Sequence, residues 1–320
     1  MACRPRRSIC FLKTHKCASS SVQNMMMRYG DRHNLSFVLP RRYNYLGNPE
    51  YFNRRMAPDS GRRRYDMLVH HSRFQEAEMR AVLAPDPVFV TIVREPASLF
   101  ESIFMYYGME KHFKTSLQSL SRRMSDSGPS ATFDLRARSY RRRYGFNQMS
   151  FDLGFEPAQF LNASAVEAFV HRVDATFDLV MIAERMSESL VLLRHLLCWD
   201  LDDVVTFKLN RRNEKFRQPL NSEDREGLRK LNAVDTKLYG YFVKRLDERI
   251  AAFGRGRMAV EVKLLDNYTR EWYDRCVGHE VPVMRLEGRE NNSEECRGFL
   301  TEELAFTDHL RRKQQRVPVR

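Results

Sequence analysis

The sequence predicts an α/β protein in which a parallel sheet is flanked by helices and a mostly helical C-terminal region follows. Short apolar segments alternate with helical segments through residues 9–210, which is typical of strands joined by right-handed crossovers. The clearest strand, "VFVTIV" at Val88–Val93, is apolar on both faces, as parallel strands covered by helices are. From Ser222 to Val277 the apolar residues recur at helical spacing instead.

The N-terminal elements follow from local patterns of apolar residues and from turn residues. We expect, in chain order, a strand at Ile9–Leu12, a helix from Ser19 to about Tyr29, a long irregular connection at residues 41–66, a strand at Met67–His71 and a helix at Gln75–Leu83. The Pro-Asp-Pro turn that follows this last helix separates it from the strand at Val88–Val93.

The later elements rest on capping signals and apolar runs. We expect a helix at Leu99–Tyr107 opened by Pro96, a mobile Ser- and Arg-rich excursion or lid at residues 111–143, a helix opened by a capping box at Ser164–Glu167, a strand at Phe177–Ala183, a helix capped by Ser187, and a frayed basic tail at residues 311–320. Together these elements predict one domain over residues 1–320, with an α/β core at 9–210 and a helical extension at 220–320.

The chain of 320 residues carries a formal net charge of +13, which favours anionic partners. Nucleotides, sulfated or phosphorylated sugars, nucleic acid and a membrane surface all remain open on charge alone. No nucleic-acid recognition module is present and the charge is scattered, so we expect no nucleic-acid partner. No segment approaches the roughly 20 apolar residues that span a bilayer. The chain as written is therefore expected to be soluble.

The six cysteines form no CxxC pair and no zinc-finger spacing, so no metal site is predicted. Cys276 and Cys296 are close enough in sequence to close one loop, and a disulfide between them is a hypothesis. Four N-x-[ST] triplets give weak support for a secretory lumen.

The segment "KTHKCASSS" at residues 13–21 joins the first strand to the first helix. A helix start exposes backbone N–H groups and the positive end of the helix dipole, so anions bind there. Lys16 adds a charge, and Ser19–Ser21 add hydroxyl donors. Both glycines of the Walker A loop are missing, so the turn suits a single phosphate better than a triphosphate. The alternative is an ordinary solvent-facing helix start.

A second candidate phosphate site follows the strand at Val88–Val93. Arg94 stands at the strand end, and Ser102 lies about two helical turns further on. An arginine fork with a hydroxyl can clamp a phosphate, and ligands of open α/β sheets bind beyond the carboxyl ends of the strands. Two such sites indicate a nucleotide with phosphates at opposite ends. The alternative for Arg94 is an ion pair with Glu95 or Glu101.

Several stretches resemble the galactose 3-O-sulfotransferases: "FLKTHKCASSSVQN", "HHSRF", "VFVTIVREPASLFESIFMYY", "FDLGF" and "FDLVMIAERMSESLVLLRHLLCWDLDDVVTFKLN". The resemblance runs with gaps from Ile9 to Asn210 and returns faintly near "CRGFLTEELAF". It implies a P-loop-like sulfotransferase fold, 3′-phosphoadenosine 5′-phosphosulfate (PAPS) as sulfate donor, and a Golgi lumen or membrane location. Its implied cofactor-binding residues are Lys13, Thr14, Lys16, Ser19, Ser20 and Ser21 on the 5′-phosphosulfate side, with Arg94 and Ser102 on the 3′-phosphate.

Sulfuryl transfer needs a base for the acceptor hydroxyl and a cation for the leaving oxygen, and no metal. Lys16 is the expected cation, with Lys13 as the alternative. His71 and His15 are the candidate bases, and His71 is slightly favoured because it aligns with a family histidine. His70 is given a structural role.

The resemblance also implies an acceptor, a terminal β-galactose on a glycolipid or glycoprotein, whose 3-hydroxyl would be sulfated. Asn147 and Asp152 are candidates for binding its hydroxyl groups. Two other functions stay open: a non-catalytic nucleotide- or glycan-binding member of the family, and a P-loop kinase-type transferase, which the missing Walker glycines disfavour.

Overall fold

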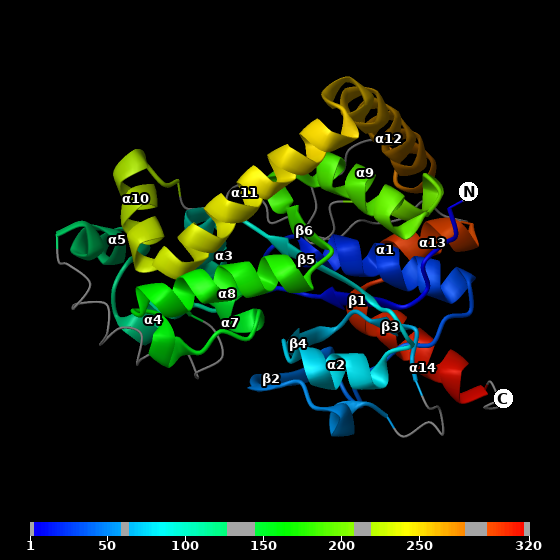
Figure 1. Cartoon of the computed structure of the whole chain (residues 1–320), viewed down its shortest axis with the longest axis horizontal. Coiled ribbons are helices and arrows are strands. Elements are labelled where there is room, and N and C mark those ends of the chain that lie inside the picture. The colour runs from blue at the N-terminus through cyan, green and yellow to red at the C-terminus, as the bar shows by residue number, and fades with distance from the viewer. Residues whose placement is uncertain (1–2, 59–63, 127–144, 208–218, 279–292, 317–320) are drawn as a thin grey trace.

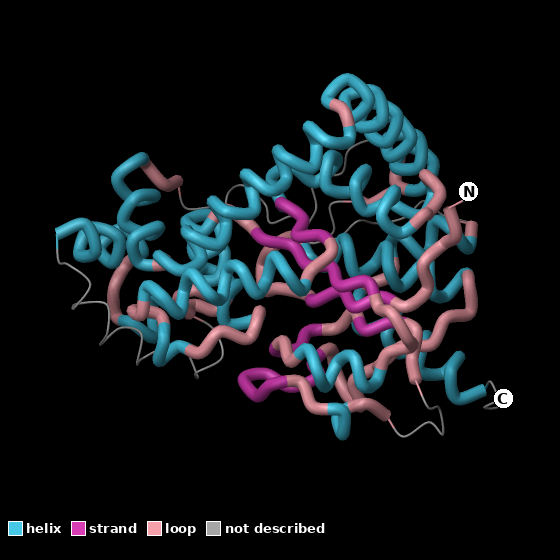
Figure 2. The backbone as a smooth tube through the Cα atoms, in the orientation of Figure 1, coloured by secondary structure: helices cyan, strands magenta, loops and turns pink. Residues whose placement is uncertain are grey.

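The structure is a computed structural model that describes residues 3–58, 64–126, 145–207, 219–278 and 293–316. Its main sheet has four strands, β1 (Ile9–Leu12), β3 (Met67–Leu68), β5 (Val88–Val93) and β6 (Leu179–Ile182), in the order β3-β1-β5-β6. All neighbouring strands pair in parallel. Figure 2 shows these strands at the centre of the molecule with helices around them. The predicted α/β class is confirmed.

Helices cover both faces of this sheet (Figure 1). In the first part of the chain they are α1 (Ser19–Arg32), α2 (Glu76–Val82), α3 (Pro96–Tyr106), α4 (Met109–Phe113), α5 (Leu117–Asp126), α7 (Gln148–Asp152), α8 (Ala163–Thr176) and α9 (Met186–Leu197). The C-terminal region adds α10 (Ser222–Leu231), α11 (Ala233–Phe253), α12 (Arg255–Cys276), α13 (Glu294–Leu300) and α14 (Glu303–Arg316). The helical character predicted for this region is confirmed.

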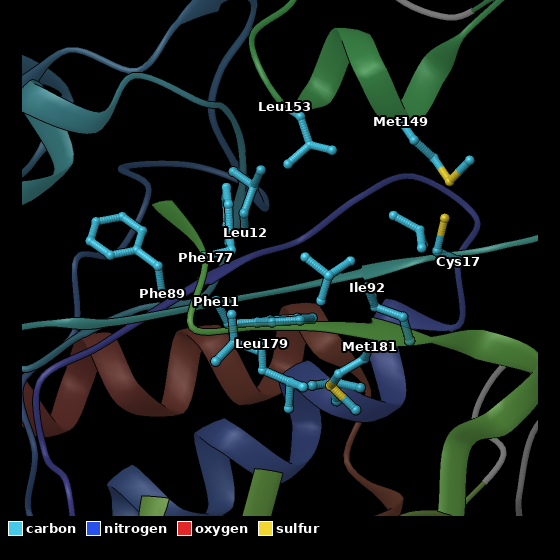
Figure 3. Close-up of a cluster of buried hydrophobic side chains, with 14 of the residues drawn as sticks. Phe11, Leu12, Cys17, Phe89, Ile92, Met149, Leu153, Phe177, Leu179 and Met181 are labelled. Atoms are coloured by element: carbon cyan, nitrogen blue, oxygen red, sulfur yellow. The ribbon is translucent and has the colours of Figure 1, made fainter. Parts of the chain in front are cut away.

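The core explains why the strands are apolar on both faces. Every residue of β1, β5 and β6 is buried. In Figure 3 the strand residues Phe11, Phe89 and Leu179 lie between α1 and α7, with Met149 on α7 and Leu153 directly after it. One hydrophobic cluster extends from Ile9 in β1 to Leu310 in α14, so the C-terminal helix shares the core of the sheet. The helical extension thus packs on the same core as the α/β part, and the single domain over residues 1–320 stays a prediction.

The prediction of an irregular connection at residues 41–66 was wrong in part. This segment contains β2 (Tyr45–Tyr51) and a 3-10 helix at Arg54–Met56. Strand β2 pairs with β4 (His71–Arg73) in a separate two-stranded parallel sheet, with Tyr45 opposite His71. The strand predicted at Met67–His71 is therefore divided between two sheets, because the chain leaves the main sheet after Leu68. Pairing between segments so far apart leaves no local pattern in the sequence.

Helix ends also differ from the sequence-based expectations. The Asn162 side chain, not that of Ser164, caps α8 by accepting the Ala165 N–H. Ser187 lies inside α9 and donates to Asp266 on α12. The other differences concern two longer segments. The excursion predicted at residues 111–143 contains the end of α4 and all of α5, and its residues 127–143 are outside the described residues. The basic tail is helical to Arg316.

The disulfide expected between Cys276 and Cys296 is present, and a second one joins Cys3 to Cys198 at the end of α9. The disulfide between Cys276 and Cys296 links the end of α12 to α13 within a small apolar cluster that includes Phe207 and Phe299. None of the helices in the five described ranges is both long and apolar enough to cross a membrane.

Candidate active site

The turn between β1 and α1 lies at the carboxyl edge of the sheet, as the sequence predicts. Lys16 and Ala18 adopt left-handed backbone conformations, with φ of 58° and 59°, which bend the chain sharply into α1. Thr14 Oγ1 donates to Ile92 O at 2.5 Å, and Ser19 Oγ donates to Thr14 O at 2.6 Å. These bonds tie the turn to the neighbouring strand and to itself. Helix α1 starts with no side-chain cap, which suits an anion at its first N–H groups.

The second predicted phosphate site adjoins the first. Strands β1 and β5 are neighbours, with Leu12 opposite Thr91, so both chain segments leave the sheet at the same edge. Arg94 Nη1 donates to Lys16 O at 2.8 Å, and the Lys16 ammonium lies 3.8 Å from the ring centroid of Tyr106 on α3. Ser102, one turn before Tyr106 on the same helix, is buried. From β1 the chain goes to β3 on one side of β1, and it later returns past β1 to β5 on the other side. α/β proteins bind ligands at such a reversal of the strand order.

The serines of the turn differ in what they contact. Ser20 is half-buried in the first turn of α1. Ser21 instead donates through Oγ to Phe207 O at 2.8 Å, which links α1 to the segment before α10. Cys17 is fully buried and its Sγ contacts His15 O at 3.3 Å, so this side chain packs into the core seen in Figure 3.

Lys13 lies in the interior, although the sequence suggested a place on the donor. Its side chain is 1% exposed, and Nζ donates to Gln23 Oε1 and to Glu303 Oε2, both at 2.6 Å. Burial lowers the pKa of Lys13, and the Glu303 carboxylate opposes that shift. Lys13 therefore forms a buried ion pair with Glu303 of α14, whereas Lys16 is half-buried within the turn.

His15 forms a close pair with Asp152 of α7. The carboxylate accepts the backbone N–H of His15 at 2.8 Å, and the Nδ1 atom of the ring lies 2.9 Å from both carboxylate oxygens. Gln148 Nε2 also donates to this carboxylate, at 2.9 Å. Since a carboxylate only accepts, Nδ1 of His15 carries a proton and Nε2 is left as the basic nitrogen. Nε2 faces the hydroxyl of Tyr45 at 3.5 Å and the amide of Asn48 at 3.4 Å.

His71 stacks directly on His15, with ring centroids 4.2 Å apart. Its Nδ1 lies 3.0 Å from Lys13 O, so this nitrogen also carries the proton. Tyr45 stacks on the His71 ring at 5.1 Å. Burial, together with the charges of Lys13 and His15, places the pKa of His71 well below its usual value. The structure thus brings both predicted bases together, and their environments differ.

His70 has the structural role expected for it. The side chain is fully buried and its Nε2 lies 2.9 Å from Thr307 Oγ1, whose hydroxyl donates to Glu303 O. Nε2 is therefore the protonated nitrogen. Burial lowers the pKa of His70 to about 3, so the ring is neutral.

The two predicted acceptor-binding residues lie in different places. Asp152 is 2% exposed and binds His15, as described above. Asn147 is fully buried, and its Oδ1 accepts the N–H groups of Val234 and Asp235 at the start of α11. Asp235 in turn accepts from Ser150, so Asn147 and Asp235 anchor α7 beneath α11. This contact holds Asp152 in place beside His15.

Four residues around the histidines had no signal in the sequence that would have identified them. Tyr45 and Asn48 belong to β2, a strand that was not predicted, and Tyr106 is the last residue of α3. Glu303 lies far from Lys13 in the chain and is one of several acidic residues near the start of α14. Within the described residues, no group of three or more His, Cys, Asp or Glu side chains is placed to hold a metal ion.

A parallel α/β sheet with an uncapped helix start after β1, an arginine after β5 and a carboxylate–histidine pair beside them fits a transferase that binds an anionic donor at this edge. Comparison with protein families makes this class specific. Residues 1–312 match the model of the family described as galactose-3-O-sulfotransferase. The chain belongs to this family.

Curated relatives agree with the family match. The chain is 38% identical over 291 residues to the galactosylceramide sulfotransferase of Bos taurus, covering 89% of this chain and 68% of the relative. It is 36% identical to galactose-3-O-sulfotransferase 3 of Mus musculus, with 87% of this chain and 65% of the relative covered. It is also 36% identical to galactose-3-O-sulfotransferase 2 of Homo sapiens, with 85% of this chain and 69% of the relative covered. The chain thus spans about two thirds of the length of these relatives.

Proposed function

We propose that this protein transfers a sulfuryl group from PAPS to the 3-hydroxyl of a terminal β-galactose on a glycolipid or glycoprotein glycan. The single observation that carries the proposal is the pair of adjoining anion sites beside a carboxylate-held histidine, in a chain of this family. A nucleotide with phosphates on both its 3′ and 5′ sides would use both sites. The kinase alternative is weaker because ATP has no 3′-phosphate for Arg94.

The residues at the carboxyl edge fit the donor. Lys16, Ser19, Ser20 and the first N–H groups of α1 would bind the 5′-phosphosulfate side, and Arg94 with Ser102 would bind the 3′-phosphate. When bound, PAPS supplies the sulfuryl group and a phosphate leaving group. Lys16 lies over Tyr106 in this structure, and its flexible stem lets the ammonium turn to neutralise charge on the leaving oxygen. Lys13 is not assigned to the donor, because its ammonium is paired with the Glu303 carboxylate.

We assign the general base to His15 rather than to His71, which the sequence slightly favoured. Asp152 holds Nδ1–H of His15, orients the ring and would stabilise the imidazolium that forms when Nε2 accepts the hydroxyl proton. His71 has a neutral carbonyl in that position and a strongly lowered pKa, so it is the weaker base. Its ring shields and orients His15 by stacking.

The acceptor side is assigned by class alone. The relatives are named for galactose and galactosylceramide, and a galactose-terminated glycan is proposed for this chain on that basis. Tyr45 and Asn48, which face Nε2 of His15, are better placed to contact the acceptor hydroxyl than the buried Asn147. Two disulfides are typical of an oxidising compartment, which supports a Golgi lumen location.

The test is sulfate transfer by the purified chain. PAPS would be incubated with a β-galactosyl disaccharide and, in parallel, with galactosylceramide, and products would be read by mass spectrometry. A 3-O-sulfated galactose from the unmodified protein and none from Lys16→Ala would support the reaction and the role of the lysine. Binding of 3′,5′-adenosine bisphosphate without any transfer to either acceptor would favour the non-catalytic alternative. If ATP competes for the site as strongly as 3′,5′-adenosine bisphosphate binds to it, the kinase-type alternative is favoured.

A further inference from the structure

The C-terminal helix α14 reaches the active site through one carboxylate. Glu303, the first residue of α14, accepts from Lys13 Nζ at 2.6 Å through Oε2 and from Asn44 Nδ2 at 3.2 Å through Oε1. Lys13 directly follows β1, and Asn44 directly precedes β2. One side chain therefore holds together the two segments that carry His15 and Tyr45.

This ion pair is enclosed by protein. Lys13 is 1% exposed, and the Glu303 side chain is 19% exposed. Burial alone would raise the pKa of Glu303, but the Lys13 ammonium beside it holds the pKa below its usual value. A buried ammonium without a counterion is costly, so Lys13 depends on Glu303 for its position. Gln23 Oε1 provides a second, uncharged contact to Nζ.

The same lysine fixes His71 through its backbone. Lys13 O accepts the proton on Nδ1 of His71, and the His71 ring lies against that of His15. A second contact supports α14 from the other side, since His70 binds Thr307 and Thr307 donates to Glu303 O. Contacts thus lead from Glu303 through Lys13 to His71, and from there to the proposed base.

We propose that Glu303 is a positioning residue for the transfer reaction. It holds the Lys13 side chain away from the donor site and thereby keeps the Lys13 carbonyl where it selects the Nδ1–H form of His71. The inference rests on the proposed function for its kinetic consequence, while its structural part concerns the tautomer of His71 and does not depend on turnover.

The test uses Glu303→Gln in the full chain, with Asp308→Asn as control. Asp308 lies on α14 and pairs at the surface with Arg311. We expect Glu303→Gln to lower kcat by roughly 3- to 10-fold, no more than removal of the His71 ring itself, because the effect reaches His15 only through His71. Affinity for 3′,5′-adenosine bisphosphate and the acceptor KM should stay within about threefold, because positioning acts on the chemical step. Nitrogen NMR of histidine-labelled protein should show His71 changing from the Nδ1–H form to a mixture. Asp308→Asn should change none of these quantities.

A second variant covers the case in which Glu303→Gln does not fold. Lys13→Met combined with Glu303→Leu removes both charges and leaves no buried ion unpaired, so it should fold. We expect this double variant to show the same lowered kcat and the same altered His71 spectrum as Glu303→Gln, because it also lacks the contact between residues 13 and 303. Unchanged kcat with an unchanged His71 spectrum in either folded variant would overturn the proposal. If the unmodified protein transfers no sulfate, the proposed function fails, and the NMR result still decides whether Glu303 selects the tautomer of His71.

Discussion

Asp152 binds His15 twice, by accepting its backbone N–H at 2.8 Å and by lying 2.9 Å from its Nδ1. The two residues come from α7 and from the turn after β1, which are far apart in the sequence. The double contact fixes both the position of the residue and the orientation of its ring. Nε2 of His15 is thereby held as the basic nitrogen.

The first prediction concerns this pair. Asp152→Asn keeps an oxygen for the backbone N–H but brings an amide N–H toward the ring, which favours the wrong tautomer of His15. We expect kcat to fall by roughly 100-fold or more, with nucleotide affinity unchanged. Steady-state kinetics and calorimetry with 3′,5′-adenosine bisphosphate measure both quantities. Glu248→Gln, which alters a surface pair with Arg245, is the control. Equal losses of kcat and of nucleotide binding would indicate local unfolding instead.

The second prediction separates the two histidines by matched substitutions. Asparagine reproduces the Nδ1 donor of histidine but has no basic Nε2. His15→Asn can still donate to Asp152, and we expect it to lose roughly 100-fold or more in kcat. His71→Asn can still donate to Lys13 O, and we expect a loss below about tenfold, since stacking alone is affected. The reverse order of the two losses would restore His71 as the base.

Much of the fold could be predicted because its determinants are local. The runs at Ile9–Leu12 and Val88–Val93 are apolar without alternation, and the structure has them as β1 and β5. Strand β2 could not be found, because its sequence "YLGNPEY" carries three turn residues, Gly, Asn and Pro, and its pairing with β4 is not local. Local patterns also predicted Ser164 as the N-cap of α8, whereas Asn162 caps this helix in the structure. The sequence does not distinguish the two, because serine and asparagine are both good N-caps.

The site was predictable where residues follow strand ends directly. Lys16, Arg94 and the two histidines were predicted in this way, and the structure places Arg94 against Lys16 O and His71 against His15. What the sequence could not show was which partner each side chain meets. Lys13 and Lys16 both follow β1 in the segment "KTHK", so the sequence does not distinguish them. In the structure Lys13 is buried against Glu303, whereas Lys16 lies over the Tyr106 ring. Asp152 could be singled out as polar, but its contact with His15 depends on how α7 packs beneath α11.

The third prediction follows from the lowered pKa of His70. This pKa is about 3 in the folded protein, against a usual value of 6.5, so the unfolded chain binds more protons between these values. The stability that comes from the neutral ring is complete above pH 6.5 and is lost as the pH falls toward 3. Gln in place of His70 keeps a donor for Thr307 and does not titrate. We expect the acid loss of unfolding free energy to be shallower in His70→Gln, by up to about 1.4 kcal/mol per pH unit.

Urea unfolding at several pH values measures this difference. Other groups with shifted pKa values, among them His71, Asp235 and Glu303, contribute in both proteins, so the comparison and not the absolute slope is informative. His71 acts in the same direction as His70. Asp235 acts in the opposite direction, because burial raises its pKa to about 6, and its contribution is lost as the pH rises through that value. Parallel curves for the two proteins would show that His70 is not buried as a neutral ring.

The fourth prediction tests the second anion site. Arg94→Met removes the guanidinium proposed for the 3′-phosphate. Hydrogen bonds to a charged group contribute about 1.5–3 kcal/mol, so binding of 3′,5′-adenosine bisphosphate should weaken by roughly 10- to 100-fold. Binding of ADP, which lacks the 3′-phosphate, should weaken much less. Arg225→Met is a matched control, since Arg225 contacts Glu95 and Ser98 at the start of the same helix α3. Equal weakening for both nucleotides would place Arg94 elsewhere on the donor.

The fifth prediction concerns the disulfide between Cys276 and Cys296. It ties α12 to α13, which packs on α1 where Asn24 donates to Gly298 O and Arg28 lies over the Phe299 ring. A closed loop of this length is worth about 3 kcal/mol. We expect the double serine variant at these two positions to melt roughly 4–5 °C lower.

Hydrogen exchange then locates the effect of opening this disulfide. The amides of α13 and of the facing turns of α1 should exchange faster, because only packing would still hold α13 against α1. The double serine variant of Cys3 and Cys198 is the comparison, since that bond ties the N-terminal segment to the end of α9 and lies outside this cluster. Faster exchange in α13 in both variants alike would mean that the helix is held by the whole fold. Faster exchange in the first variant alone would assign its docking to the Cys276–Cys296 link.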